Sequence, residues 1–222
     1  MHNVIPMLDK HVTEISLILY FFMIFGVIAS SISGAIRAIE ARMDITGAIL
    51  LAFLNSNAGG TVRDILLNVP VFWIQDQFYI WLTFIVGGLS FIIIYFKNKV
   101  IGSRKLHKIL IITDAMGIAA FCLAGVEKSL ALNQNNVIAI IMGIWTAIGG
   151  GVVADIISNR VPLVFSQELY TTVAFLGAVC FLFLAGFLEV NHAIAAFVSA
   201  FLMVGLRLYS VKKKLKLPLV KN

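Results

Sequence analysis

Charged side chains follow runs of glycine at two places inside otherwise apolar stretches of this sequence. Residues 59–64 read Gly-Gly-Thr-Val-Arg-Asp, and residues 149–155 read Gly-Gly-Gly-Val-Val-Ala-Asp. Charges within a membrane-spanning stretch are costly, and they usually face a charged partner or a watery cavity. Carboxylates at a constriction attract cations. Arg63, Asp64 and Asp155 are therefore the first candidates for a site that acts on ions.

These three residues also suggest how they pair. Adjacent residues on a helix point about 100° apart, so Arg63 and Asp64 are expected to be poor partners for each other. We predict that Arg63 reaches across to Asp155, while Asp64 meets opened backbone or water. Two carboxylates and one guanidinium leave one negative charge in excess, which favours cations. The alternative is an ion pair that only holds two helices together.

Further polar residues lie near the ends of the apolar stretches. Asp114 is predicted either to line the path or to lie among lipid headgroups. Arg37 and Lys128 are either anchors that extend their side chains to the membrane surface or charged gates of a vestibule. Serine and asparagine ordinarily bond to nearby backbone, with lining of a path as the alternative. The candidates for the path or its vestibules are Ser33, Arg37, Asn57, Asp114, Glu127 and Lys128.

The elements that position these residues must be membrane-spanning helices. The 222 residues are 60% hydrophobic and 13% charged, whereas soluble proteins are about 25% charged. The apolar runs are continuous, which excludes the alternating pattern of a transmembrane β-barrel. Charged and turn-forming residues divide the chain into seven predicted spans, namely 15–36, 45–73, 78–96, 106–126, 136–165, 169–188 and 193–209.

The second and fifth of these spans are too long to cross as straight helices. At 1.5 Å per residue each would exceed about 40 Å, against about 30 Å of hydrocarbon. Both contain the glycine runs and then a proline. Glycine lowers the cost of leaving helical geometry and exposes backbone groups, although it also permits close helix packing. We predict that the helices break at Gly59, Gly60, Gly149, Gly150 and Gly151.

The chain contains an internal repeat. Gly59, Gly60 and Asp64 fall on Gly150, Gly151 and Asp155 at a constant shift of 91 residues, from 59 to 150. The match continues to Val69-Pro70 and Val161-Pro162 after one inserted residue. Three spans per copy require opposite insertion of the copies, so we predict a single membrane domain, 1–222, with an inverted repeat of 15–96 and 106–188, a seventh helix at 193–209 and a basic cytoplasmic tail at 210–222. Broken helices of such repeats meet at transport sites.

Lysine and arginine predict the orientation. One cluster at 97–108 flanks the link between the third and fourth spans, and another at 207–221 follows the seventh. Both are expected on the cytoplasmic side, near anionic lipid headgroups, which places the amino terminus outside. The same pattern favours lipid over nucleic acid as the partner of the basic residues.

An enzymatic function is not predicted. Asp64 and Asp155 resemble the paired carboxylates of intramembrane aspartyl proteases, but the Gly-x-Gly that precedes a catalytic aspartate is missing. The sequence has no nucleophile elbow, zinc-protease motif or phosphate-binding loop. His2, His11, His107 and His192 lie at span ends or tails, so neither a metal site nor a cofactor is expected.

The assembled motifs resemble the prokaryotic branch of the TRIC family, the trimeric intracellular cation channels. The resemblance covers nearly the whole chain and lies in residues 33–35, 59–67, 70–73, 149–155 and 160–163, with Ala154 standing where that pattern leads us to expect arginine. It implies a homotrimer in the bacterial inner membrane, with a path for K⁺ or Na⁺ in each protomer around the second and fifth helices.

Three functions are weighed from the sequence. A passive channel for monovalent cations is the leading one. The second is a secondary carrier for a small solute such as an amino acid, because inverted repeats with broken helices also build carriers. The third, a purely structural scaffold, would need neither the glycine runs nor charges within the spans.

Overall fold

The computed structural model describes residues 5–166 and 169–215, and all regular structure in this part of the chain is helical. The helices are α1 (Ile5–Glu40), α2 (Ile45–Leu66), α3 (Phe72–Gln75), α4 (Phe78–Ala131), α5 (Asn136–Ile157), α6 (Leu163–Ser166), α7 (Tyr170–Leu182) with the π-helical turn Phe183–Phe187, and α8 (His192–Lys213). The described residues contain seven segments long and apolar enough to cross a membrane. The prediction of seven spans is confirmed.

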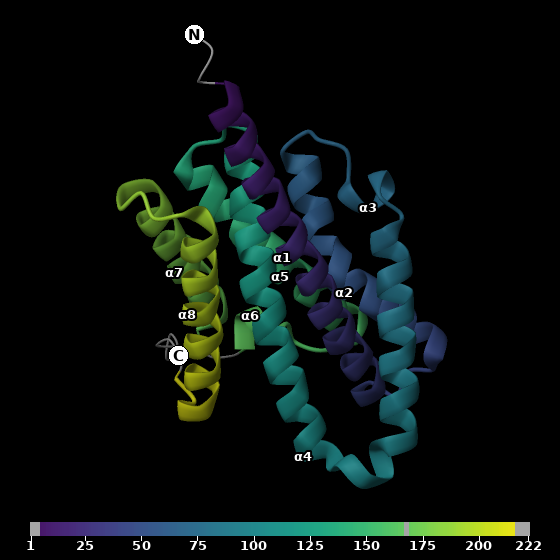
Figure 1. Ribbon diagram of the computed structural model, residues 1–222. Coiled ribbons are helices and arrows are strands. Elements are labelled where there is room, and N and C mark those ends of the chain that lie inside the picture. Colours follow the sequence, from purple (N-terminus) through teal and green to yellow (C-terminus); the bar gives the residue numbers. More distant parts are fainter. Residues whose placement is uncertain (1–4, 167–168, 216–222) are drawn as a thin grey trace.

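Helix α4 supplies two of these spans, Phe78–Lys97 and Arg104–Ala131. Helical geometry continues between them, where the sequence predicted a link, but the two legs run in opposite directions in Figure 1. The second leg passes through the middle of the molecule, and its most apolar window is 78% buried against 28% for the first leg. The second leg is therefore the central element of the bundle.

The two halves of the chain fold with the same local structure. Helices α2 and α5 begin at 45 and 136 and end at 66 and 157, a shift of 91 residues at both ends. Asp44 caps α2 by accepting from the Gly47 amide at 2.8 Å, and Asn135 caps α5 by accepting from the Ile138 amide at 3.0 Å. The short helices α3 and α6 begin at 72 and 163, also 91 apart. Pro70 and Pro162 are 92 residues apart, so the one-residue insertion before the prolines is compensated before the short helices begin.

The breaks that follow α2 and α5 lie beyond the glycines. Both helices continue through their glycine runs, so the prediction that these residues interrupt the helices is wrong. Asn68 and Asn159 adopt left-handed conformations with φ of 54° and 55°. Asparagine tolerates this conformation, which commonly ends helices. Each short helix then leads back toward the bundle, so the long spans are broken as predicted, but at 67–71 and 158–162.

The glycines instead permit α2 and α5 to cross at very close range. A Cβ atom on Gly59 would lie 2.4 Å from the Thr146 carbonyl oxygen, and one on Gly150 would lie 2.0 Å from the Asn55 carbonyl oxygen. The residue that each helix contacts on the other has a lower number as its own residue number rises: Asn55 contacts Gly150, whereas Gly59 contacts Thr146. The two helices are therefore antiparallel. Only residues without side chains permit this approach, which is the packing role that small residues commonly have between membrane helices.

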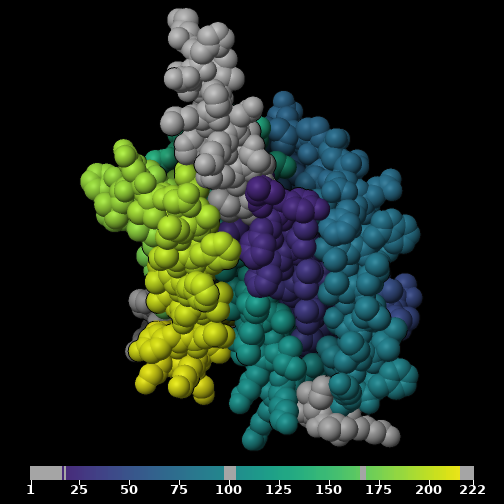
Figure 2. Space-filling model, in the orientation of Figure 1, coloured from purple at the N-terminus to yellow at the C-terminus, as the bar shows by residue number. Residues whose placement is uncertain are grey.

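The outside of the bundle is largely apolar. Figure 2 shows α8, α1 and both legs of α4 on one face, and many large apolar side chains on the surface are more than one third exposed. Such a surface suits contact with hydrocarbon or with other apolar protein surfaces. The reversal of α4 and the basic last turn of α8 lie at the same end of the molecule (Figure 1), as the charge pattern predicted.

Candidate functional site

Two buried charge centres lie beside the two helix breaks. In the first, the Asp64 centre, the Lys128 Nζ atom bonds the Asp64 Oδ1 atom at 2.7 Å. In the second, the Asp155 centre, the Arg37 Nη1 atom bonds the Asp155 Oδ1 atom. Lys128 and Arg37 are repeat equivalents, and so are Asp64 and Asp155. Each repeat therefore supplies the cation for the carboxylate of the other repeat.

Each carboxylate also holds the short helix beyond its break. The Asp64 Oδ2 atom accepts from the Phe72 amide at 2.9 Å, and the Asp155 Oδ2 atom accepts from the Leu163 amide at 3.0 Å. Phe72 and Leu163 are the first residues of α3 and α6. A free backbone amide inside a membrane protein is costly, and the carboxylates satisfy these two. Asp64 and Asp155 thus fix the geometry of the breaks.

Arg63 does not reach Asp155, and that prediction is wrong. Its Nε atom instead bonds the Oδ1 atom of its own neighbour, Asp64, at 2.7 Å. The long side chain folds back along its helix, while Arg37 already occupies Asp155. The Arg63 Nη1 atom lies 4.0 Å from the Met23 sulfur, its guanidinium lies 5.8 Å from the centroid of the Phe72 ring, and its Nη2 atom has no partner although the residue is fully buried.

The Asp155 centre contains a second carboxylate. The Asp114 Oδ1 atom accepts from the Arg37 Nη2 atom at 2.8 Å and from the Tyr170 hydroxyl at 3.1 Å. The Arg207 guanidinium lies over the Tyr170 ring at 4.7 Å. Asp114 is 7% exposed and Arg37 is 1% exposed. Asp114 is therefore an interior residue, and the prediction of Arg37 as a surface anchor is wrong.

Lys128 differs from Arg37 in exposure. Its side chain is 20% exposed while its ammonium still bonds Asp64. This contact favours the charged vestibule role over the membrane anchor that the sequence left open. Lysine is a flexible point charge, whereas arginine offers a planar fork. The two equivalent cations therefore hold their carboxylates in different ways.

The groups that are directly ion-paired in the two centres carry net charges of opposite sign. Arg63 and Lys128 against Asp64 leave one positive charge in the Asp64 centre. Arg37 against Asp114 and Asp155 leaves one negative charge in the Asp155 centre. The negative excess predicted from the sequence counted only three of these six groups, and all six together sum to zero. The buried Arg207 guanidinium, which also lines the cavity at the Asp155 end, offsets the negative charge of the ion-paired groups there.

The serine and asparagine candidates lie near the α2 and α5 crossing. Ser31 and Ser56 donate to helix carbonyls, and Asn55 donates to the Ser30 carbonyl at 2.7 Å. Asn57 donates to the Thr83 hydroxyl at 3.3 Å, but its Oδ1 atom has no partner. The buried Ser33 hydroxyl also lacks a partner. Ser31, Asn55 and Ser56 therefore have the ordinary role of bonding to backbone, whereas Ser33 and Asn57 each keep a buried polar atom without a partner.

Glu127 belongs to neither centre. Its Oε1 atom lies 3.3 Å from the His192 Nδ1 atom, and its buried Oε2 atom has no partner. The contact joins the end of α4 to the start of α8. The sequence placed His192 at a span end and gave no reason to pair it with Glu127.

Two cavities with charged walls lie at the two centres. The one at the Asp64 centre has a volume of about 180 Å³ and is lined by Leu19, Tyr20, Met23, Arg63, Phe72, Tyr79 and Lys128. The one at the Asp155 centre is smaller, about 70 Å³, and includes Arg37, Asp114, Asp155 and Arg207. Sequence reasoning missed Tyr170 and counted Arg207 in the basic cluster at 207–221, although Arg207 is 2% exposed. Its place inside the last predicted span, 193–209, was the available signal.

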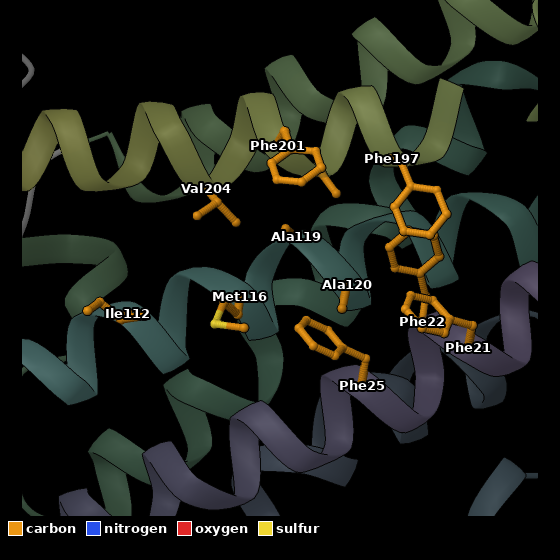
Figure 3. Close-up of a pocket in the computed structure, with 11 residues that line it drawn as sticks. Phe21, Phe22, Phe25, Ile112, Met116, Ala119, Ala120, Phe197, Phe201 and Val204 are labelled. Carbon is orange, nitrogen blue, oxygen red and sulfur yellow. The ribbon is translucent and has the colours of Figure 1, made fainter. Parts of the chain in front are cut away.

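A third cavity, larger than the other two, is apolar. It has a volume of about 260 Å³ and lies between α1, α4 and α8 (Figure 3). Phenylalanine rings from α1 and α8 face it together with Met116 of α4. A hydrated cation would lose its water there without gaining polar contacts, so this cavity is a poor path for ions. Among the described residues, no group of three potential metal-binding side chains is found.

An inverted repeat of spans with broken helices and buried charges at the breaks defines a multi-pass membrane protein of the transport class. The chain belongs to the family described as "Glycine transporter", whose model matches residues 20–95 and again 111–186. These two matches are themselves 91 residues apart. They agree with the repeat found in the sequence and in the helix bounds.

Curated relatives are membrane proteins of bacteria. A UPF0126 membrane protein of Vibrio cholerae is 36% identical over 73% of this chain and 66% of that protein. The UPF0126 inner membrane protein YadS of Escherichia coli is 28% identical over 91% of this chain and 96% of that protein. The UPF0126 membrane protein YvgT of Bacillus subtilis is 30% identical over 88% of this chain and 93% of that protein.

Solved structures of similar fold are channels. The TRIC trimeric intracellular cation channel orthologue from Rhodobacter sphaeroides superposes with a TM-score of 0.80 and 30% identity, over 89% of this chain and 98% of that one. A prokaryotic TRIC channel solved in 0.5 M KCl superposes with a TM-score of 0.81 and 28% identity, over 91% of this chain and 100% of that one. The resemblance to the prokaryotic TRIC family is confirmed, and these relatives agree with the prediction that the chain is not an enzyme.

Proposed function

We propose that this protein is a passive channel for monovalent cations such as K⁺ and Na⁺, with a path inside each protomer. The observation that supports it is the reciprocal pairing of charges at the two helix breaks. Asp64 lies five residues beyond Gly59, and Asp155 lies five residues beyond Gly150, in opposite directions along antiparallel helices. Because Gly150 lies opposite Asn55, four residues before Gly59, the two carboxylates stand roughly 20 Å apart along the crossing at 1.5 Å per residue. The two centres thus lie on either side of the close contact between α2 and α5.

Lys128 is the proposed gate. While its ammonium bonds Asp64, the centre has a net positive charge that opposes cations. Movement of this flexible side chain toward the exposed side leaves Arg63 and Asp64 as a neutral pair. The two carboxylates of the Asp155 centre, Asp114 and Asp155, are the proposed attraction for cations at the other end. Glycine carbonyls and the free oxygens of Ser33 and Asn57 are the proposed polar contacts between the two centres.

The assembly and location are proposed from the solved relatives. The Rhodobacter sphaeroides channel is described as trimeric, and YadS is described as an inner membrane protein. We propose a homotrimer in the inner membrane, with basic residues against anionic lipid headgroups. The largely apolar surface is compatible with contacts between copies of this chain and with lipid.

Planar bilayers test the channel directly. Purified protein under a KCl gradient is expected to give discrete current steps that reverse near the K⁺ potential. Lys128→Gln removes the opposing charge, so its current is expected to rise about fivefold, which corresponds to roughly 1 kcal/mol, the interaction of two unit charges 4 Å apart in water. Lys105→Gln, at an exposed position of α4, is the matched control and keeps the wild-type current.

The family description favours a second candidate, a carrier for a small amino acid such as glycine. Inverted repeats with broken helices suit a carrier as well as a channel. Vesicles with labelled glycine separate the two functions. Saturable uptake by protein that gives no current steps would replace the channel with the carrier.

The orientation is a separate prediction. With Cys180→Ala as background, Gln77→Cys is expected to react with an impermeant thiol reagent in intact cells, whereas Lys105→Cys should react only after the inner membrane is opened. Gln77 and Lys105 are exposed and lie near opposite ends of the first leg of α4, while native Cys122 is fully buried. If Lys105→Cys were labelled in intact cells and Gln77→Cys were not, the protein would have the opposite orientation to the one proposed.

A further inference from the structure

The cavity at the Asp64 centre has an unmet demand for negative charge. Arg63 offers five N–H donors, but only its Nε atom has a carboxylate partner. The Nη1 atom faces a thioether sulfur at 4.0 Å, which is a weak acceptor, and the Nη2 atom has none. A buried charged donor without a partner is costly. Arg63 is one of the residues that line the cavity.

Asp64 alone cannot balance the charge of this centre. Its Oδ2 atom accepts from the Phe72 amide, and its Oδ1 atom accepts from both Arg63 and Lys128. Two cations therefore share a single negative charge. The missing partner of this centre is one further anion.

The Asp155 centre, at the equivalent place in the other repeat, has a second anion. In the Asp155 centre the second carboxylate belongs to Asp114, which binds Arg37. The equivalent of Asp114 in the other repeat, 91 residues earlier, is Met23. Met23 lines the cavity and lies next to Arg63. The Asp64 centre thus lacks a carboxylate at the position where the Asp155 centre has one.

We propose that this cavity binds a small carboxylate, either a simple monocarboxylate such as acetate or the carboxylate group of an amino acid, between Arg63 and Lys128. The two oxygens of a carboxylate match the planar fork of a guanidinium better than a spherical ion does. The rings of Tyr20, Phe72 and Tyr79 form an apolar wall for the rest of the ligand. The site concerns one end of the path and is independent of whether the protein acts as a channel or as a carrier.

Thermal unfolding of the purified protein in detergent tests the site. At constant Na⁺ concentration, replacement of chloride by acetate is expected to raise the unfolding midpoint by several degrees and to saturate, because a ligand that binds only the folded state stabilises it. Arg63→Gln should abolish the rise. Arg160→Gln, a partly exposed arginine of the Asp155 end that bonds Glu40, is the matched control and should keep it.

Met23→Asp provides the sharpest test, because it supplies the missing carboxylate from the chain itself. This variant is expected to fold, to lose the acetate response and to unfold at a higher midpoint than wild type in chloride. Saturation-transfer NMR of the acetate methyl protons gives a second readout on the wild-type protein. Competition by glycine would identify an amino acid as the ligand, whereas acetate binding without competition would identify a simple monocarboxylate.

A wild-type midpoint that is the same in acetate and chloride, together with no transfer to acetate, overturns the proposal. An unchanged acetate response in Arg63→Gln or Met23→Asp does so as well. These measurements need no ion flow. Current steps without acetate binding would remove only the carboxylate site, and acetate binding without current steps would remove only the channel.

Discussion

Replacing Gly150 with alanine is expected to prevent α2 and α5 from packing and to leave little folded protein. The added Cβ atom would lie 2.0 Å from the Asn55 carbonyl oxygen, a distance that no pair of atoms of this kind tolerates. The obstacle is helix backbone rather than a flexible side chain, so two helices must separate. Overpacking in a core typically costs 1–3 kcal/mol, and we expect at least about 3 kcal/mol here. The unfolding midpoint in detergent measures this effect.

A matched glycine gives the control. Gly205 lies in α8, and an added Cβ atom there would meet nothing within 4 Å. Gly205→Ala is therefore expected to keep the midpoint or to raise it slightly, because alanine is the better helix former. Gly59→Ala, at the equivalent position of the other repeat, should resemble Gly150→Ala, since its Cβ would lie 2.4 Å from the Thr146 carbonyl oxygen. Normal stability of both Gly59→Ala and Gly150→Ala would contradict the close crossing.

The glycines also show how far the sequence predicts this fold. The spans, the repeat and the existence of the breaks follow from apolar run lengths and from residues at constant spacing. The position of the breaks does not, because glycine favours both an opened helix and a close contact, and the choice depends on a partner helix far away in sequence. Asn68 and Asn159, at equivalent places just before the prolines, were the available signal for the true breaks.

The charge centres could be predicted only in part. The sequence identified all six charged residues of the two centres but paired Arg63 with Asp155 and interpreted Arg37 as a possible anchor. Partner choice depends on depth and side-chain reach, which periodicity does not supply. The shared shift of 91 residues between Arg37 and Lys128, and between Asp64 and Asp155, was the signal for reciprocal pairing. An inverted repeat brings the end of one copy against the break of the other.

Loss of Arg37 is expected to be the most damaging single change in the Asp155 centre. Arg37→Met leaves Asp114 and Asp155 buried together without their shared cation. Breaking a buried pair by removing one partner typically costs about 3–5 kcal/mol, and two stranded carboxylates place this variant at the upper end. We expect loss of the monodisperse folded species in size-exclusion chromatography, with a sharply lower unfolding midpoint where protein remains.

Removal of the stranded charges should restore the fold. The triple variant with Arg37→Met, Asp114→Asn and Asp155→Asn keeps oxygen acceptors for Tyr170 and for the Leu163 amide. It removes the charges of all three ion-paired groups and leaves only the Arg207 guanidinium, which keeps its place over the Tyr170 ring. Replacing all members of a buried ionic group is often close to neutral, whereas removing one member is not. The triple variant is therefore expected to recover most of the wild-type midpoint while losing the cation selectivity of the path.

A second ion pair at this end shows that burial, rather than pairing itself, determines how much stability is lost when the arginine is replaced. Arg160 bonds Glu40 at 2.8 Å, but the two side chains are 31% and 23% exposed. Arg160→Gln should cost only about 0–1 kcal/mol, as for other solvent-accessible pairs. If Arg37→Met were as mild as Arg160→Gln, the carboxylates would have to be reached by water or to hold protons. The Asp155 centre would then be open in the resting protein rather than closed by Arg37.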